Sequence, residues 1–220
     1  MNFTIKQIGK TVLGQAIDCW FSKSTSGLKI LIVGGVHGDE KEGIEIANGL
    51  IKKLLDKNIL STLAIIPCLN RDGELLNLRS NYNNVDLNRN IPTTNWTEKF
   101  TNPRYNPGAA AASEPETQSF MSLLDSFKPD LIISLHSYSE SLILYGPGSG
   151  RFDEEVQSLA TNLNLKLVPK MSYEVTGSLN TLSAERQVPT ITIEAPRDES
   201  WIGLSEKFIL GIEAFLKTLS

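Results

Sequence analysis

The chain has 220 residues, of which 40% are hydrophobic and 21% charged, a balance that is ordinary for a globular protein and argues against disorder. Its formal net charge is −4, and it lacks a basic block that could neutralise phosphates, so we expect no nucleic-acid partner. No apolar run approaches the roughly 18 residues that a transmembrane helix needs, so we expect no membrane partner.

The length suits a single domain spanning residues 1–220, because domains usually run to about 100–200 residues and α/β domains often run longer. The two cysteines, Cys19 and Cys68, lie inside apolar runs, which predicts buried thiols and not a disulfide framework. The N-terminal residues lack the apolar core and cleavage site of a signal peptide, so the expected compartment is the cytoplasm. The sequence does not reveal the oligomeric state.

The first elements predict an α/β fold. Residues 3–8 and 15–21 alternate apolar and polar side chains, which indicates an opening hairpin. A buried strand is predicted at 28–33, followed by a helix over 42–55 with apolar residues at helical spacing and a second strand at 63–66. This strand–helix–strand order is typical of a parallel crossover in an α/β sheet.

Residues 70–112 are rich in Asn, Pro and Ala and show little periodicity. So long an irregular stretch in a compact domain is usually functional. It ends at Ser113–Glu116, which reads as a capping box with Pro in the first turn and predicts a helix to about Phe127. Further strands are predicted at 131–135, 142–145 and 190–193, and further helices at 152–163, 178–187 and 203–218.

The only two histidines, His37 and His136, each follow a predicted central strand. Open α/β sheets bind ligands beyond the carboxyl ends of their strands, where loops and helix N-termini converge. His37 and Glu40 form an H-x-x-E pair, and two imidazoles with one carboxylate suit a catalytic zinc ion. A bare H-x-x-E also arises by chance, and a histidine after a strand can be a hydrogen-bonded structural residue.

Two further groups of side chains could serve such a site. Arginines in the irregular stretch can bind carboxylates in a bidentate manner, although solvated loop charges are the plainer interpretation. Glu194 follows a predicted strand and could act as general base for a water molecule, although a surface acid or salt-bridge partner is the alternative. The irregular-stretch group comprises Arg71, Asp72, Arg79, Asp86, Asn88 and Arg89.

Seven segments between residues 33 and 196 then follow one another in a familiar order. They are VGGVHGDEKEG, PCLNRDG, LRSNYNNVDLNRNIPTTNW, SEPETQ, SLHSYSESLILY, SYEVTGS and TITIEAP. In these segments the sequence resembles the zinc carboxypeptidases of the M14 type, and within them the bacterial murein tripeptide amidase branch. Each segment is modest alone, but the set in this order is specific.

The resemblance implies a single-domain, three-layer α/β/α fold with a mixed, mostly parallel central sheet. It also implies one zinc ion and a small peptide substrate, and it assigns roles residue by residue. His37, Glu40 and His136 look like the metal ligands, Glu194 like the catalytic general base and acid, and Arg79 like the arginine that stabilises the oxyanion. Asn88 and Arg89 resemble the pair that binds a substrate carboxylate, Tyr173 the tyrosine that closes over substrate, and Ser137 a residue that lines the site.

The activity that the resemblance implies is hydrolysis of the γ-D-glutamyl–diaminopimelate amide of murein peptides during cell-wall recycling. The segment HSYSE at 136–140 is more like general metallocarboxypeptidases, which remove C-terminal amino acids. An N-acyl amino acid deacylase of the aspartoacylase and succinylglutamate desuccinylase kind is a further alternative. A peptide-binding module without catalysis is opposed by the presence of all three implied ligands and the implied base.

Overall fold

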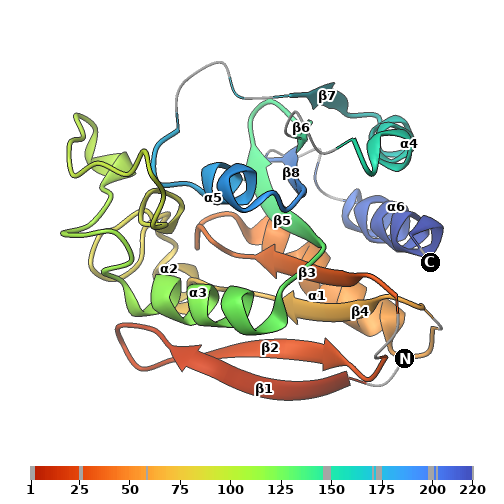
Figure 1. The fold of residues 1–220 in the computed structure, drawn as a ribbon, viewed down its shortest axis with the longest axis horizontal. Helices are drawn as coiled ribbons and strands as arrows, with labels where there is room; N and C mark the ends of the chain where they lie inside the picture. Colours follow the sequence, from red (N-terminus) through yellow and green to blue (C-terminus); the bar gives the residue numbers. More distant parts are fainter. Residues whose placement is uncertain are drawn as a thin grey trace.

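The structure, a computed structural model, describes residues 3–24, 27–57, 59–145, 150–169, 171, 175–197, 201 and 203–219. Within these ranges the strands are β1 (Phe3–Lys10), β2 (Ala16–Ser22), β3 (Lys29–Gly34), β4 (Thr62–Ile66), β5 (Leu131–Tyr138), β6 (Leu142–Tyr145), β7 (Lys166–Val168) and β8 (Thr190–Pro196). They form one eight-stranded sheet in the order β1-β2-β4-β3-β5-β8-β6-β7 (Figure 1).

The sheet is mixed, as predicted. Strands β3–β4, β3–β5, β5–β8 and β6–β7 pair in parallel, whereas β1–β2, β2–β4 and β6–β8 pair antiparallel. The predicted opening hairpin is therefore confirmed, and so is the parallel crossover from β3 to β4.

Helices cover both faces of this sheet and complete three layers. They are α1 (Lys41–Leu54), α2 (Arg71–Leu76), α3 (Pro115–Phe127), α4 (Asp153–Leu163), α5 (Leu179–Arg186) and α6 (Ser205–Thr218). Ile30 and Ile32 of β3 belong to a core with α1, α4 and α6, and Leu31 and Val33 belong to a second core with α3 and α5. Because successive strand side chains alternate between faces, a strand that is apolar throughout buries both. In Figure 1, α3 and α5 lie in front of the sheet and α1 lies behind it.

The connectivity places a crevice at the middle of the sheet. From β3 the chain passes through α1 to β4 on one side, and the later strand β5 pairs with β3 on the other side. The carboxyl ends of β3 and β5 are therefore neighbours at a point where the strand order reverses, which is where open α/β sheets bind ligands. The two histidines lie at this edge.

The structure differs from the predicted elements at three places. The irregular stretch contains the short helix α2 and two 3₁₀ turns, η1 (Leu87–Arg89) and η2 (Pro103–Tyr105). The three-residue strand β7 was not predicted, because three residues are too few to show a period. The predicted capping box is wrong: α3 begins at Pro115 with no side-chain cap, and the Ser113 hydroxyl donates to Glu114 Oε1 at 2.7 Å.

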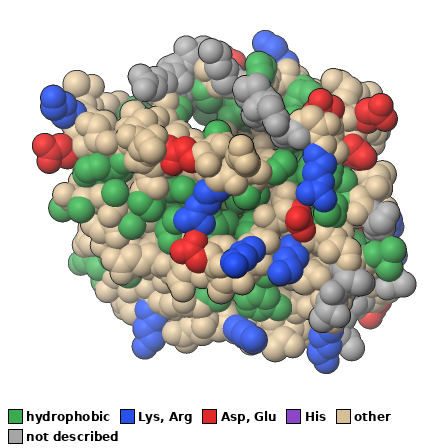
Figure 2. Space-filling view, viewed as in Figure 1, with side chains coloured by type: hydrophobic (Ala, Val, Ile, Leu, Met, Phe, Trp, Pro, Cys, Tyr) green, Lys and Arg blue, Asp and Glu red, His purple; other side chains and the backbone are tan. Residues whose placement is uncertain are grey.

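The surface in Figure 2 mixes basic and acidic side chains and shows neither histidine. Among the described residues, no helix combines the length and the apolar character needed to cross a bilayer.

Candidate metal centre

Three buried side chains from two parts of the chain meet at the β3–β5 edge. His37 lies in the loop that follows β3, Glu40 immediately precedes α1, and His136 lies near the carboxyl end of β5. In β5, Ile133 and Leu135 face the core that contains α1, so the alternation of the strand turns His136 toward the opposite face. The fold thus brings together the three residues that the sequence singled out.

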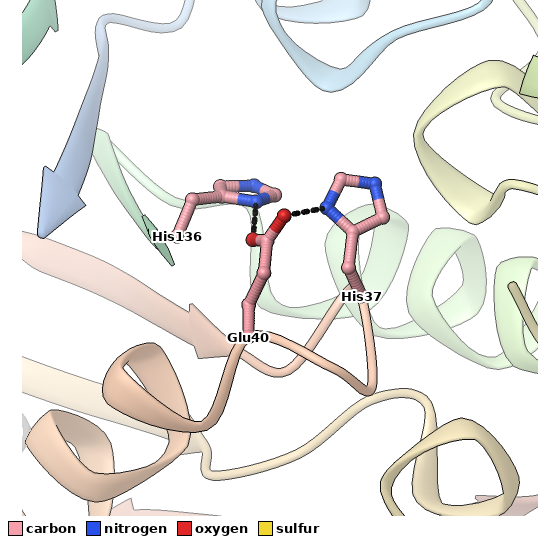
Figure 3. A group of neighbouring side chains, drawn as sticks. All are labelled: His37, Glu40 and His136. Carbon is pink, nitrogen blue, oxygen red and sulfur yellow. Dashed lines mark hydrogen bonds and ion pairs between the residues drawn. The ribbon is translucent and has the colours of Figure 1, made fainter. Parts of the chain in front are cut away.

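The donor atoms of these side chains converge. Glu40 Oε1 lies 2.8 Å from His37 Nδ1, and Glu40 Oε2 lies 2.7 Å from His136 Nδ1. Figure 3 shows the carboxylate between the two imidazole rings, whose centroids are 4.9 Å apart. One donor atom from each residue lies within 4.8 Å of the other two.

The protonation of this group reflects its burial and its charges. Burial alone would raise the pKa of Glu40, but the two histidines outweigh it and hold that pKa well below its ordinary value. For His37, burial lowers the pKa, whereas the carboxylates of Glu40 and Asp86 raise it and prevail over burial and Arg79. Both ring nitrogens of His37 face carboxylates, which matches a protonated imidazole in the metal-free protein.

Asp86 and Arg79 surround His37 on its other side. Asp86 Oδ1 lies 3.0 Å from His37 Nε2 and also accepts the backbone N–H of Asn88 at 2.9 Å. Arg79 donates to Asp86 Oδ2 through Nε at 3.2 Å and Nη2 at 3.1 Å, and to Glu40 Oε1 through Nη1 at 3.1 Å. A carboxylate behind a ligand histidine fixes its ring and tautomer. The sequence flagged Asp86 only as one charge of the irregular stretch and missed this contact.

Glu194 stands beside the three-residue group. It is the register partner of His136 on the adjacent parallel strand β8, so the two side chains leave the same face of the sheet. Burial raises the pKa of Glu194 above its ordinary value, His136 opposes this, and Glu40 adds to it. A carboxylate with a raised pKa is well suited to exchange protons near neutral pH.

Asn88 and Arg89 lie in the turn η1, directly after Asp86. Asn88 Oδ1 accepts the backbone N–H of Leu179 at 3.0 Å, so its amide oxygen is occupied by the start of α5. Arg89 is buried, and its Nη1 donates to the Asn88 carbonyl at 2.8 Å. The ring of Tyr105 faces both Arg89 and Arg79. No sequence signal marked Tyr105, because it lies in a stretch without periodicity.

The remaining predicted residues are placed differently. Ser137 is buried, and its hydroxyl donates to Glu42 Oε2 in the first turn of α1 at 2.7 Å. Tyr173 lies outside the described residues. Arg71 pairs with Glu74 at 2.6 Å, and Asp72 accepts from the Thr11 hydroxyl at 2.6 Å, so neither is part of this centre.

The donor set fits a zinc ion. Two imidazole nitrogens and one carboxylate oxygen are the protein ligands of many catalytic zinc sites, which keep a further position open. All three side chains are buried, and the carboxylate behind His37 supplies the outer hydrogen bond that such histidines usually make.

Known proteins resemble this chain in sequence and fold. The family model described as zinc carboxypeptidase matches residues 2–201. Murein peptide amidase A from Escherichia coli (strain K12) is 31% identical over 223 residues, covering 95% of this chain and 88% of that protein. The crystal structure of murein-tripeptide amidase MpaA from Escherichia coli O157 superposes with a TM-score of 0.83 at 28% identity, covering 97% of this chain and 91% of the other. Carboxypeptidase A from Helicoverpa armigera shares the fold, with a TM-score of 0.83 at 19% identity over 99% of this chain and 68% of that one.

Proposed function

The chain belongs to the zinc carboxypeptidase family, and from that premise we propose that it hydrolyses the γ-D-glutamyl–diaminopimelate amide of murein peptides in cell-wall recycling. The observation that carries the proposal is the convergence of His37, Glu40 and His136 next to Glu194. The choice of substrate is supported by the relatives that are named murein peptide amidase A.

His37, Glu40 and His136 would hold one zinc ion through two imidazole nitrogens and a carboxylate. When bound, zinc acts as a Lewis acid and lowers the pKa of a coordinated water molecule from 15.7 to about 7. Asp86 holds the His37 ring through Nε2 and leaves Nδ1 on the side of Glu40. The loop after β3 and the end of β5 thus supply the three ligands.

Glu194 takes a proton from the attacking water and later delivers it to the nitrogen of the leaving amine. Its burial favours the protonated form more than in an ordinary glutamate, which suits a group that must both accept and donate. Arg79 donates N–H groups toward the negative charge that develops on the scissile carbonyl oxygen. In comparable sites one such donor contributes about 3–4 kcal/mol.

Asn88 and Arg89 bind a carboxylate of the leaving group. Because Asn88 Oδ1 already accepts from Leu179, the amide nitrogen of Asn88 is the group left to donate. Ser137 lines the site, and its hydroxyl donates to Glu42. The resemblance alone assigns Tyr173 as the residue that closes over the substrate. Recognition of a carboxylate beside the scissile amide gives cleavage at a chain end.

We further propose that residues 1–220 act as one catalytic domain, because all the strands that the structure describes form one sheet. The cytoplasm is the compartment that we propose, since free murein tripeptide is encountered there.

General metallocarboxypeptidase activity is the second candidate, and the segment HSYSE at 136–140 favours it.

Incubation of zinc-loaded protein with L-Ala-γ-D-Glu-meso-diaminopimelate tests the proposal. We expect release of diaminopimelate, which a chelator abolishes and added zinc restores. A panel of ordinary peptides with different C-terminal residues serves as the comparison. Trimming of those peptides while the tripeptide stays intact would replace the proposal with the second candidate.

A further inference from the structure

Tyr105 has a backbone that is fixed against the residues around the metal centre. It ends the turn η2, which Asn102 caps by accepting the N–H of Arg104 at 3.0 Å. The next residue, Asn106, accepts the backbone N–H of Asp86 through its carbonyl at 2.8 Å. The Asn106 side chain also donates to the carbonyl of Asn84 at 2.9 Å. These bonds tie Tyr105 to the segment that holds His37 in place.

The ring of Tyr105 contacts two guanidinium groups at once. Its centroid lies 4.9 Å from the guanidinium carbon of Arg89 and 5.7 Å from that of Arg79. Both distances fall within the roughly 6 Å range of a favourable cation–π contact. Tyr105 is 36% exposed, so part of the ring faces solvent beside these two arginines.

The two arginines depend on this ring to different degrees. Arg79 is already fixed by charged hydrogen bonds to Asp86 and Glu40. Arg89 has no ion pair within 4.0 Å among the residues that the structure describes, and its side chain donates only to the Asn88 carbonyl. An aromatic face can hold a guanidinium without neutralising its charge, whereas a carboxylate partner would compete with an anionic ligand.

We propose that Tyr105 is a positioning residue, which presents Arg89 to the carboxylate of the leaving group at a set distance from Arg79. This inference rests on the role that we propose for Arg89. It predicts that Tyr105 influences substrate binding through the carboxylate and has little influence on the chemical step.

Replacing Tyr105 with Leu and with Phe tests the inference in the zinc-loaded protein. We expect Tyr105→Leu to raise KM for the tripeptide roughly tenfold with kcat nearly unchanged, since about 1.4 kcal/mol of binding is lost. Tyr105→Phe keeps the aromatic face and should stay within about twofold of the parent. Calorimetry with meso-diaminopimelate should show the same roughly tenfold weakening for the Leu variant, without any turnover.

A modified substrate separates positioning from a general structural role. When the diaminopimelate carboxylate next to the scissile amide is replaced by a carboxamide, the Leu variant and the parent should have the same KM. Tyr82→Leu is the matched control, because Tyr82 lies in the same irregular stretch and is 50% exposed. Thermal unfolding of each variant verifies that it is folded. If the Leu variant is unstable, Tyr105→Met replaces it in the same measurements.

The inference is overturned if Tyr105→Leu leaves KM unchanged, if it weakens both substrates equally, or if Phe fails to restore binding. These outcomes differ from a failure of the proposed function. If the parent protein does not cleave the tripeptide but binds diaminopimelate more tightly than the Leu variant does, the substrate is wrong and the inference stands.

Discussion

A single carboxylate on β8 sets the pH dependence that we expect. Glu194 must be ionised to accept a proton, and burial raises its pKa above the ordinary value of 4.5. Protonation of Glu194 inactivates the site, so kcat/KM should fall on an acid limb as the pH drops through a pKa that burial raises and a bound zinc ion would lower. Glu194→Gln should lower kcat by about 10²–10⁴-fold and remove the limb, with zinc content unchanged by elemental analysis. Full activity of this variant, or an acid limb that persists in it, would refute the assignment.

Asp86 governs how firmly His37 is oriented. It is fully buried and accepts from His37 and Arg79. Asp86→Asn removes the carboxylate charge beside His37 and Arg79. The affinity for zinc should therefore fall by about 10–100-fold, as competition with a chromogenic chelator would measure. Asp125→Asn is the matched control, because Asp125 forms an exposed ion pair with Arg186 away from this centre. An unchanged zinc affinity in the Asp86 variant would show that the contact does not matter for metal binding.

The turn before α5 packs against the segment that carries Arg89. Gly177 has a φ of +58°, and its carbonyl accepts from Ile91 N–H at 3.0 Å. A Cβ atom at position 177 would lie 2.1 Å from the carbonyl oxygen of Arg89. Side chains at this position therefore meet both a strained backbone and a direct collision with the segment that carries Arg89.

We expect Gly177→Ala to lower the free energy of unfolding by clearly more than the roughly 1–2 kcal/mol of left-handed strain, and to raise KM because Arg89 must shift. Gly14→Ala separates the two effects, since Gly14 has a φ of +80° and no atom within 4 Å of the added Cβ. Urea unfolding and steady-state kinetics on both variants provide the comparison. Equal destabilisation of the two would show that the contact with Arg89 carries no cost.

Elements with a clear period could be predicted from the sequence, and those shaped by other segments could not. The alternation in β2 and the helical spacing of α1 each arise from burial of one face, which the local sequence records. The cap of α3 could not be predicted in this way. Its Glu114 carboxylate accepts instead from Asn81 and Asn83, which lie more than 30 residues earlier in the chain.

At the scale of the whole molecule, the sheet order explains why part of the site was predictable. His37 follows the central strand β3, His136 lies near the carboxyl end of the central strand β5, and parallel neighbours bring such positions together. Glu194 follows from the same rule, because β8 pairs with β5. Tyr105 and the contact of Asp86 with His37 arise from the path of an irregular segment, and no local pattern records that path.

Anomalous diffraction from crystals of the zinc-loaded protein, measured on both sides of the zinc absorption edge, tests the metal centre directly. We expect one zinc peak per chain, bounded by His37, Glu40 and His136. A zinc peak held by other residues, or none between these three side chains, would contradict this assignment of the metal centre.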